Sequence, residues 1–213
     1  MVATGLFYVG AVLFVNGLLL LGIVEPRAAA IMNLFVGSLQ ILTPTYVIFT
    51  ANGDAATILT GSGLYLFGFT YLYVGIGLLA GLDTTGVGWF SLFVAIAALG
   101  YSWANFTLAG APWLGVIWLY WAALWTLFWL VLGLKRESLT RYTGWVTLIE
   151  AWVTAAIPGF LLLTGQWPET GMTAVVLAAI GVVMFVVLLP TLRGPRPTAP
   201  APDDSPDPAH ARS

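Results

Sequence analysis

The sequence predicts an all-α polytopic membrane protein. Of its 213 residues, 60% are hydrophobic and only 8% are charged, and the mean hydropathy is +0.95. Soluble domains of this length do not have that balance. A helix that crosses a bilayer needs about 20 apolar residues. Seven segments are long and apolar enough to cross: 3–24, 28–51, 60–81, 86–106, 112–134, 142–165 and 171–189.

These segments predict three parts of the chain. We expect a six-helix domain over residues 1–167 and an additional transmembrane helix at 168–190. The first segment lacks the basic start of a signal peptide, so we expect it to be retained as a helix. Beyond residue 190, proline, alanine and charged residues dominate, and such a composition cannot bury a core. Residues 191–213 are therefore predicted to form a disordered cytoplasmic tail.

The basic residues predict the orientation of the helices. If successive helices cross in alternating directions, all of the lysine and arginine residues between and after the helices lie on one side of the membrane. Cytoplasmic loops of membrane proteins carry an excess of these residues. The opposite side would carry Asp54 and Glu169 and no basic residue. We therefore expect the N-terminus outside and the C-terminus in the cytoplasm. The basic residues are Arg27, Lys135, Arg136, Arg141, Arg193 and Arg196.

Residue content excludes several classes of chemistry. The chain has no cysteine and one histidine, His210, which lies in the predicted tail. A disulfide, a transition-metal site, a haem or another cofactor is therefore not expected, and the net charge of -2 does not indicate nucleic-acid binding. A retinal protein is not expected, because the last predicted helix has no lysine to hold retinal. An intramembrane protease is not expected either, because the predicted helices offer neither an acid pair nor a serine–histidine arrangement at depth. We expect a protein that is not an enzyme.

Polar residues within the predicted helices are candidates for function. Ionisable side chains inside a bilayer are costly and usually functional. Glu150 lies about eight residues into its helix, at a depth of roughly 12 Å given 1.5 Å per residue. It could line a solute path or form a structural hydrogen bond to a neighbouring helix. The same two readings apply to four uncharged residues: Asn16, Asn33, Gln40 and Thr154.

Aromatic residues form a stripe in the stretch GVIWLYWAALW. Trp118, Trp121 and Trp125 follow one another at steps of three and four, so they share one face of a helix. Tryptophan normally lies at the membrane interfaces, but Trp121 and Trp125 are near the middle of their helix. Phe69 and Tyr73 are likewise near the middle of theirs. Rings at this depth could pack a bundle core or line a narrow pore that selects by size and shape.

Six motifs carry a resemblance to a known family. They are LFYVGAVLFVNG, MNLFVGSL, LFGFTYLYVGIG, WFSLFVAI, IWLYWAALW and LIEAWVTAAIP, and they follow in this order over about residues 4–165. With them the chain resembles the AmiS/UreI family of urea and short-chain amide channels. The resemblance implies a six-helix channel bundle with its own pore in each protomer, assembled as a homohexamer in the bacterial plasma membrane. The helix at 171–189 lies beyond that pattern.

The resemblance also implies which residues line the pore. The residues that match the family's constriction and its buried glutamate are Phe69, Tyr73, Trp118, Trp121, Leu124, Trp125 and Glu150. The expected function is passive passage of urea or a small aliphatic amide such as acetamide, which a cytoplasmic amidase or urease would consume. The alternative is a proton-coupled amide carrier that uses Glu150. Histidine-rich outer loops, present in the family's acid-gated member, are missing here, so gating by histidine is not expected.

Overall fold

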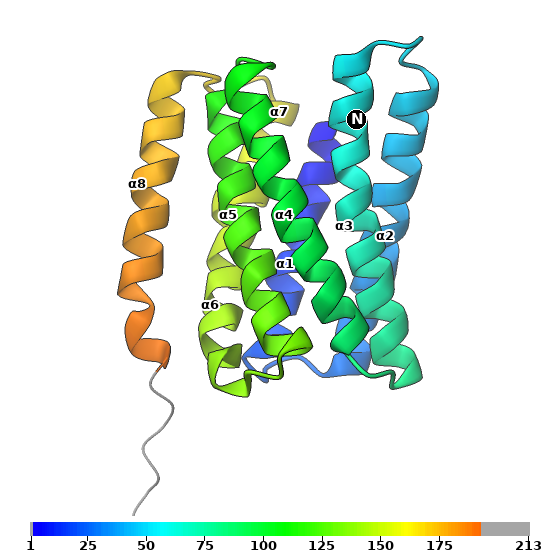
Figure 1. Ribbon diagram of the computed structural model, residues 1–213, viewed down its shortest axis with the longest axis vertical. Helices are drawn as coiled ribbons and strands as arrows, with labels where there is room; N and C mark the ends of the chain where they lie inside the picture. The colour runs from blue at the N-terminus through cyan, green and yellow to red at the C-terminus, as the bar shows by residue number, and fades with distance from the viewer. Residues whose placement is uncertain (1, 193–213) are drawn as a thin grey trace, which may run out of the picture.

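The computed structural model describes residues 2–192, and within that range it is all-helical, as the sequence predicts. Seven helical spans in these residues are long and apolar enough to cross a membrane. They run roughly parallel to one another, with α8 at one edge of the bundle (Figure 1). The predicted tail, apart from residues 191 and 192, lies outside the described residues. The spans are α1 (Val2–Leu20), α2 (Pro26–Phe49), α3 (Ala55–Ala80), α4 (Thr85–Thr107), α5 with η1 (Pro112–Phe128, Trp129–Gly133), α6 with η3 and α7 (Thr140–Glu150, Ala151–Ala156, Ile157–Leu163), and α8 (Gly171–Val187).

Two helix ends differ from the expected bounds for local reasons. The α3 helix begins at Ala55 instead of residue 60, because the Asp54 side chain accepts a hydrogen bond from the Thr57 amide at 2.8 Å and caps the helix. Hydrogen bonding by the side chain and the amide of Thr57 also lowers the pKa of Asp54. The α1 helix ends at Leu20, before residue 24, because the chain turns there and Gly22 has a φ of 75°.

The sixth span contains a change of helical pitch. A π-helical segment, η3, follows Glu150 and is followed in turn by Pro158 in α7. Proline has no amide hydrogen, so a regular α-helix would leave a carbonyl without a partner one turn earlier. Local π adjustments of this kind keep backbone groups satisfied in a membrane helix. The span therefore crosses without breaking, although Pro158 lies inside it.

Glycine allows helices to approach closely at several points. A methyl group on Gly10 would lie 2.6 Å from the Ala156 nitrogen, and one on Gly17 would lie 2.9 Å from Leu148. The α1 helix therefore packs almost backbone to backbone against the sixth span, which is the small-residue mode of contact in membranes. The pair Gly77 and Gly81 has a small-xxx-small spacing, but both positions face open space.

The α8 helix is attached to the bundle by two tyrosine side chains. The Tyr120 hydroxyl donates to the Leu177 carbonyl at 2.6 Å, and the Tyr142 hydroxyl donates to the Phe185 carbonyl at 3.2 Å. Gly181 leaves room for the Tyr120 ring, because a methyl group there would lie 2.8 Å from the ring and its hydroxyl. These contacts join α8 to α5 and α6.

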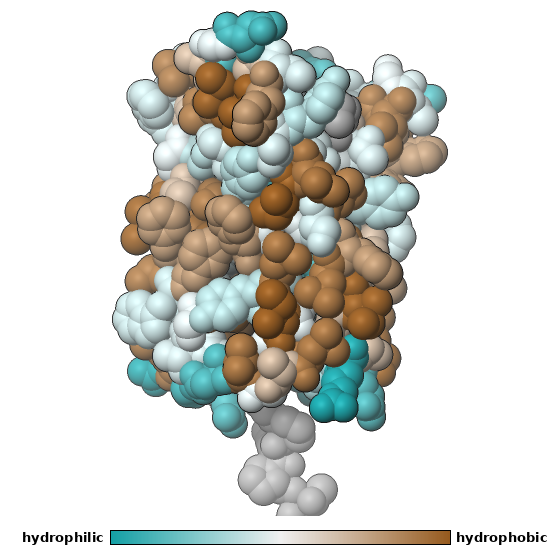
Figure 2. Space-filling model, turned by 90° about the vertical axis from the view of Figure 1, so that its right-hand side faces the viewer, coloured by the Kyte–Doolittle hydropathy of each residue, from teal (hydrophilic) through white to brown (hydrophobic). Residues whose placement is uncertain are grey.

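The outer surface is consistent with a lipid environment. Large apolar side chains such as Phe35, Phe49, Ile96 and Trp103 are exposed. Figure 2 shows hydrophobic side chains over much of the middle of one face, with hydrophilic ones gathered toward the two ends. The protein is therefore a multi-pass membrane protein whose most buried span is α5 with η1.

Candidate functional site

Three cavities follow one another from one end of the bundle to the other. We name them by their place in the orientation of Figure 1, where the loop containing Asp54 is at the top and the loop containing Lys135 is at the bottom. The upper cavity has a volume of about 310 Å³, the central cavity about 30 Å³ and the lower cavity about 100 Å³. The central cavity has room for little more than one water molecule, so it is the smallest of the three.

Shared wall residues connect the three cavities. Trp121 lines both the upper and the central cavity. The central and lower cavities share five residues, which we call the neck: Asn16, Val74, Val87, Phe128 and Leu132. The series therefore describes one interrupted path, with aromatic rings at its upper junction and a mainly apolar neck at its lower one.

A cluster of rings surrounds the upper junction. The Phe67 ring centroid lies 4.7 Å from that of Trp121 and 4.8 Å from that of Trp125, and both pairs are edge to face. Trp118 continues the cluster upward, with its centroid 5.0 Å from that of Trp121 and stacked on Tyr101 at 4.6 Å. Such geometries are favourable for aromatic pairs, so these rings hold one another in place around the path.

The Trp121 indole is also fixed by a hydrogen bond. Its ring nitrogen donates to the Thr154 hydroxyl at 3.0 Å, and that hydroxyl donates to the Glu150 carbonyl at 2.7 Å. Thr154 is fully buried and lines none of the three cavities. Its hydroxyl group therefore orients the tryptophan ring and contributes no polar group to the walls of the three cavities.

On α5 the structure places the expected residues along the path. Trp118 lines the upper cavity, and Leu124 and Trp125 line the central one with Trp121. Trp129, four residues after Trp125, packs edge to face on Trp89 with centroids 5.9 Å apart.

On α3 the aromatic residues beside the tryptophans are two positions earlier than expected. Phe67 and Tyr71 are buried and line the central cavity. Phe69, which was expected at the constriction, is half-exposed, stacks on Tyr65 and lines none of the three cavities. Tyr73 lies lower than expected, on the wall of the lower cavity. The stretch FGFTYLY has rings four apart on two faces, and spacing alone does not distinguish them.

Glu150 is fully buried, and neither of its carboxyl oxygens has a hydrogen-bond partner among the described residues. It lies outside the walls of the three cavities. An unpaired buried polar group of this kind is rare and needs an explanation. Glu150 is therefore a buried acid, as its place in the sequence indicates, but it does not line the cavities as the resemblance implies.

The three amide side chains have different positions. Asn16 forms part of the neck, and it exchanges two hydrogen bonds with Asn33 at 3.0 and 2.7 Å. Asn33 is fully buried and lines none of the cavities. Gln40 is also fully buried and donates to the Gly5 carbonyl at 2.8 Å. Of the three, only Asn16 reaches the path, and Asn33 and Gln40 connect helices.

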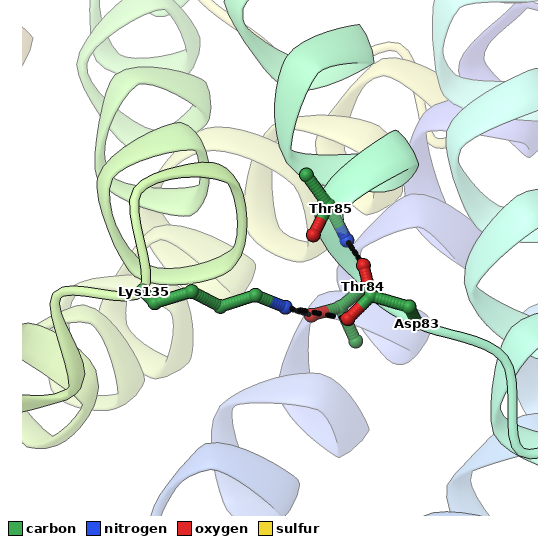
Figure 3. A network of polar contacts seen from close by, with 4 residues as sticks. All are labelled: Asp83, Thr84, Thr85 and Lys135. Carbon is green, nitrogen blue, oxygen red and sulfur yellow. Dashed lines mark hydrogen bonds and ion pairs between the residues drawn. The ribbon is translucent and has the colours of Figure 1, made fainter.

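An ion pair lies at the rim of the lower cavity. The Lys135 ammonium group lies 3.0 Å from the Asp83 carboxylate and 2.8 Å from the Thr84 hydroxyl, and the Thr85 amide donates to Asp83 at 2.8 Å (Figure 3). Asp83 and Thr84 line the lower cavity. This group therefore ties the loop between α3 and α4 to the end of the fifth span.

The ion pair is expected to be insensitive to pH between 5 and 8. Hydrogen bonds from Thr85, followed by the one from Lys135, lower the pKa of Asp83 from 3.8 to about 2. A lowered carboxyl pKa gives stabilisation that is present above pH 3.8 and lost as the pH falls through about 2. We expect solute flux through reconstituted protein to respond to pH equally in the wild type and in Asp83→Asn. A response between pH 5 and 8 that disappears in Asp83→Asn would contradict this expectation.

Comparison with known proteins gives a consistent picture. The model of the AmiS/UreI family transporters matches residues 1–166. The candidate transporter AmiS2 of Rhodococcus erythropolis is 54% identical over 94% of this chain and 97% of its own length. A candidate amidate-substrate transporter of Mycolicibacterium smegmatis is 51% identical over 93% of this chain and 94% of its own length. The acid-activated urea channel of Helicobacter pylori is 36% identical over 76% of this chain and 97% of its length.

Solved structures of the Helicobacter pylori urea channel match the fold. The cryo-EM structure of its closed state has a TM-score of 0.72 and 34% identity, and the crystal structure has 0.70 and 35%. Each match covers all of the solved chain but 79% of this one. The matches to the Rhodococcus and Mycolicibacterium proteins leave fewer residues of this chain unmatched than the 17 residues of α8, so they include at least part of this helix. This chain belongs to the AmiS/UreI family of transporters.

Proposed function

We propose that the protein is a passive channel for urea or short-chain aliphatic amides. The observation that carries this proposal is the path of three cavities that narrows at the ring cluster of Phe67, Trp121 and Trp125. The relatives named as a urea channel and as an amidate-substrate transporter support the class of solute.

The chemistry of the walls supports selection of flat neutral solutes. No charged side chain lines the upper or the central cavity within residues 2–192. An ion would lose its hydration shell at the rings without replacement ligands, at a cost of many kcal/mol. A planar amide can instead place its faces against indole rings while its polar edges meet a few hydrogen-bonding groups.

Orientation and assembly complete the proposal. The end with Arg27, Lys135, Arg136 and Arg141 would face the cytoplasm of a bacterial plasma membrane, following the positive-inside rule. The upper cavity would then open outward. We propose a homohexamer, as the family resemblance implies, with the exposed apolar side chains facing lipid or other protomers. A cytoplasmic amidase or urease would remove the solute and maintain its gradient.

Stopped-flow light scattering of proteoliposomes tests the channel. Purified protein should raise the permeability to urea and acetamide far above that of protein-free liposomes, with no requirement for a pH gradient or a membrane potential. Glycerol, which is not planar, should pass much less readily. Permeability no higher than that of empty liposomes would overturn the proposal.

A proton-coupled carrier is the second candidate, and the unpartnered carboxyl group of Glu150 is the observation that favours it. Glu150→Gln keeps the shape of the side chain and removes its proton exchange. In a passive channel, this variant should keep urea and acetamide flux within about threefold of the wild type, because an isosteric change in a packed site costs little. In a carrier, it should abolish accumulation of acetamide against its gradient when a pH difference is imposed.

Glu137→Gln is the matched control, because it makes the same chemical change at an exposed site in the short 3₁₀ helix η2 (Glu137–Leu139). Radiolabelled acetamide in liposomes with and without an imposed pH difference gives the measurement. Accumulation in the wild type and in Glu137→Gln, but not in Glu150→Gln, would establish the carrier and reject the passive channel.

A further inference from the structure

The neck between the central and lower cavities has a single polar side chain. Four of its five residues, Val74, Val87, Phe128 and Leu132, have apolar side chains, and the fifth is Asn16. A solute that passes from one cavity to the other must therefore pass this amide group, and it has no other side-chain hydrogen-bonding group at that point.

The orientation of the Asn16 amide is determined by Asn33. The Asn33 amide nitrogen donates to the Ala29 carbonyl at 2.9 Å and to the Asn16 side-chain oxygen at 2.7 Å. A rotation of the Asn33 amide would place its oxygen against the Ala29 carbonyl, so the nitrogen must lie there. The Asn33 oxygen is then left to accept from the Asn16 nitrogen, at 3.0 Å.

This pairing leaves part of Asn16 unused. A primary amide has two donor hydrogens and two acceptor lone pairs. One of each is occupied by Asn33, so one hydrogen and one lone pair remain. Asn16 is 7% exposed while Asn33 is fully buried, so the remaining groups on Asn16 are those that can meet a molecule in the neck.

We propose that Asn16 is a specificity-determining residue that hydrogen-bonds the solute amide in the neck, and that Asn33 is the positioning residue that fixes its orientation. This inference rests on the proposed channel function and names the group that distinguishes among its solutes. The free lone pair of Asn16 accepts from a solute NH₂ group, and its free hydrogen donates to a solute carbonyl.

Urea and acetamide provide a direct readout of this role. The two molecules have nearly the same planar shape, and acetamide carries a methyl group where urea carries a second NH₂. A change in pore width affects both alike, whereas loss of a hydrogen-bonding group from an apolar neck penalises urea more, since its additional NH₂ group is left unpaired. The ratio of urea to acetamide permeability therefore separates hydrogen bonding from packing.

The experiment replaces the pair together, because removing both partners of a buried hydrogen bond is much less disruptive than removing one. In proteoliposomes, Asn16→Leu/Asn33→Leu is expected to lower urea permeability roughly tenfold and the ratio of urea to acetamide permeability about fivefold, as the loss of about 1 kcal/mol per hydrogen bond gives. Asn33→Leu alone leaves Asn16 in the neck but free to rotate, and it should lower the ratio by a smaller factor.

Gln40→Met is the matched control. Gln40 is a buried amide on the same helix, α2, as Asn33, but it lines none of the three cavities, so its loss should leave the ratio unchanged. Size-exclusion chromatography confirms assembly of each variant, and Asn16→Ser replaces the double variant if that does not assemble. A ratio in the Asn16 variant within about 1.5-fold of those of the wild type and Gln40→Met would overturn the inference. A wild type that carries neither solute would instead reject the channel itself.

Discussion

Trp125→Ala is expected to abolish the size selectivity of the path. Trp125 is buried, lines the central cavity and lies edge to face with Phe67 at 4.8 Å between centroids. Removing the indole opens a gap on one side of the ring cluster, where the cavity has a volume of only about 30 Å³. Permeability to solutes larger than acetamide, such as butyramide and glycerol, should rise roughly tenfold, which is the discrimination that a close-fitting apolar pocket provides. Stopped-flow measurement over a series of amides of increasing length gives the result.

The same substitution carries a cost in stability. Replacing a buried tryptophan by alanine typically costs about 3–5 kcal/mol, so Trp125→Ala should also unfold at a lower temperature in detergent. Trp125→Phe keeps an aromatic ring and should have an intermediate effect on both quantities. Trp103→Ala is a control for loss of an indole, because Trp103 is exposed on α4. Unchanged selectivity in an assembled Trp125→Ala protein would show that the ring does not define the narrowest point.

The sequence was sufficient to predict the membrane spans. Runs of about 20 apolar residues identify membrane helices because the bilayer sets their length, and all seven were confirmed as helices. The stripe of Trp118, Trp121 and Trp125 was interpreted as a possible pore wall because Trp121 and Trp125 lie too deep for the interfacial role of tryptophan, and all three residues line the upper or the central cavity. Depth along a helix can thus be read from its sequence.

It was harder to predict which face of a helix points into the bundle. In the α3 stretch, Phe67 and Tyr71 share one face and Phe69 and Tyr73 share another, and both pairs are four residues apart. Every face of a transmembrane helix is apolar, so the hydrophobic periodicity that orients a soluble helix is weak here. Only the packing of α3 against its neighbours shows that Phe67 and Tyr71 face the tryptophans.

Contacts between helices explain the other differences. Asn16 and Asn33 were treated as separate candidates, and their pairing depends on how α1 lies against α2. Glu150 was expected on the path because a buried acid is costly, but its side chain is fully buried and lines none of the three cavities. Glycine gives a similar result: Gly77 is paired with Gly81 at the spacing typical of a packing motif and faces open space, whereas Gly88 has no glycine at that spacing and makes a very close contact.

The Gly88 contact supports the neck from outside. A methyl group at Gly88 would lie 2.1 Å from the Gly133 nitrogen and 2.4 Å from its Cα. Gly133 ends the π-helical segment η1, which begins just after Phe128 and includes Leu132. Val87, next to Gly88, is also a neck residue. Three of the five neck residues therefore lie on the two helices that this contact holds together.

Gly88→Ala is accordingly expected to affect both stability and transport. The added carbon meets backbone atoms, which cannot rotate away as a side chain can, so the fourth and fifth spans must move apart. Overpacking of a close contact costs about 3 kcal/mol, which corresponds to a fall of roughly 10 °C in the unfolding temperature for a chain of this size. Separation of the two helices would also displace Val87, Phe128 and Leu132 and so widen the neck. Urea and acetamide permeability should then change by similar factors, unlike in the Asn16 variants, because the substitution changes the width of the neck.

Gly100→Ala on the same helix is the control. It has nothing within 4 Å of the new methyl group and should leave both stability and transport unaltered. Equal unfolding temperatures for the two variants would mean that the spans adjust around Gly88 without strain, and that the width of the neck is set by its own side chains.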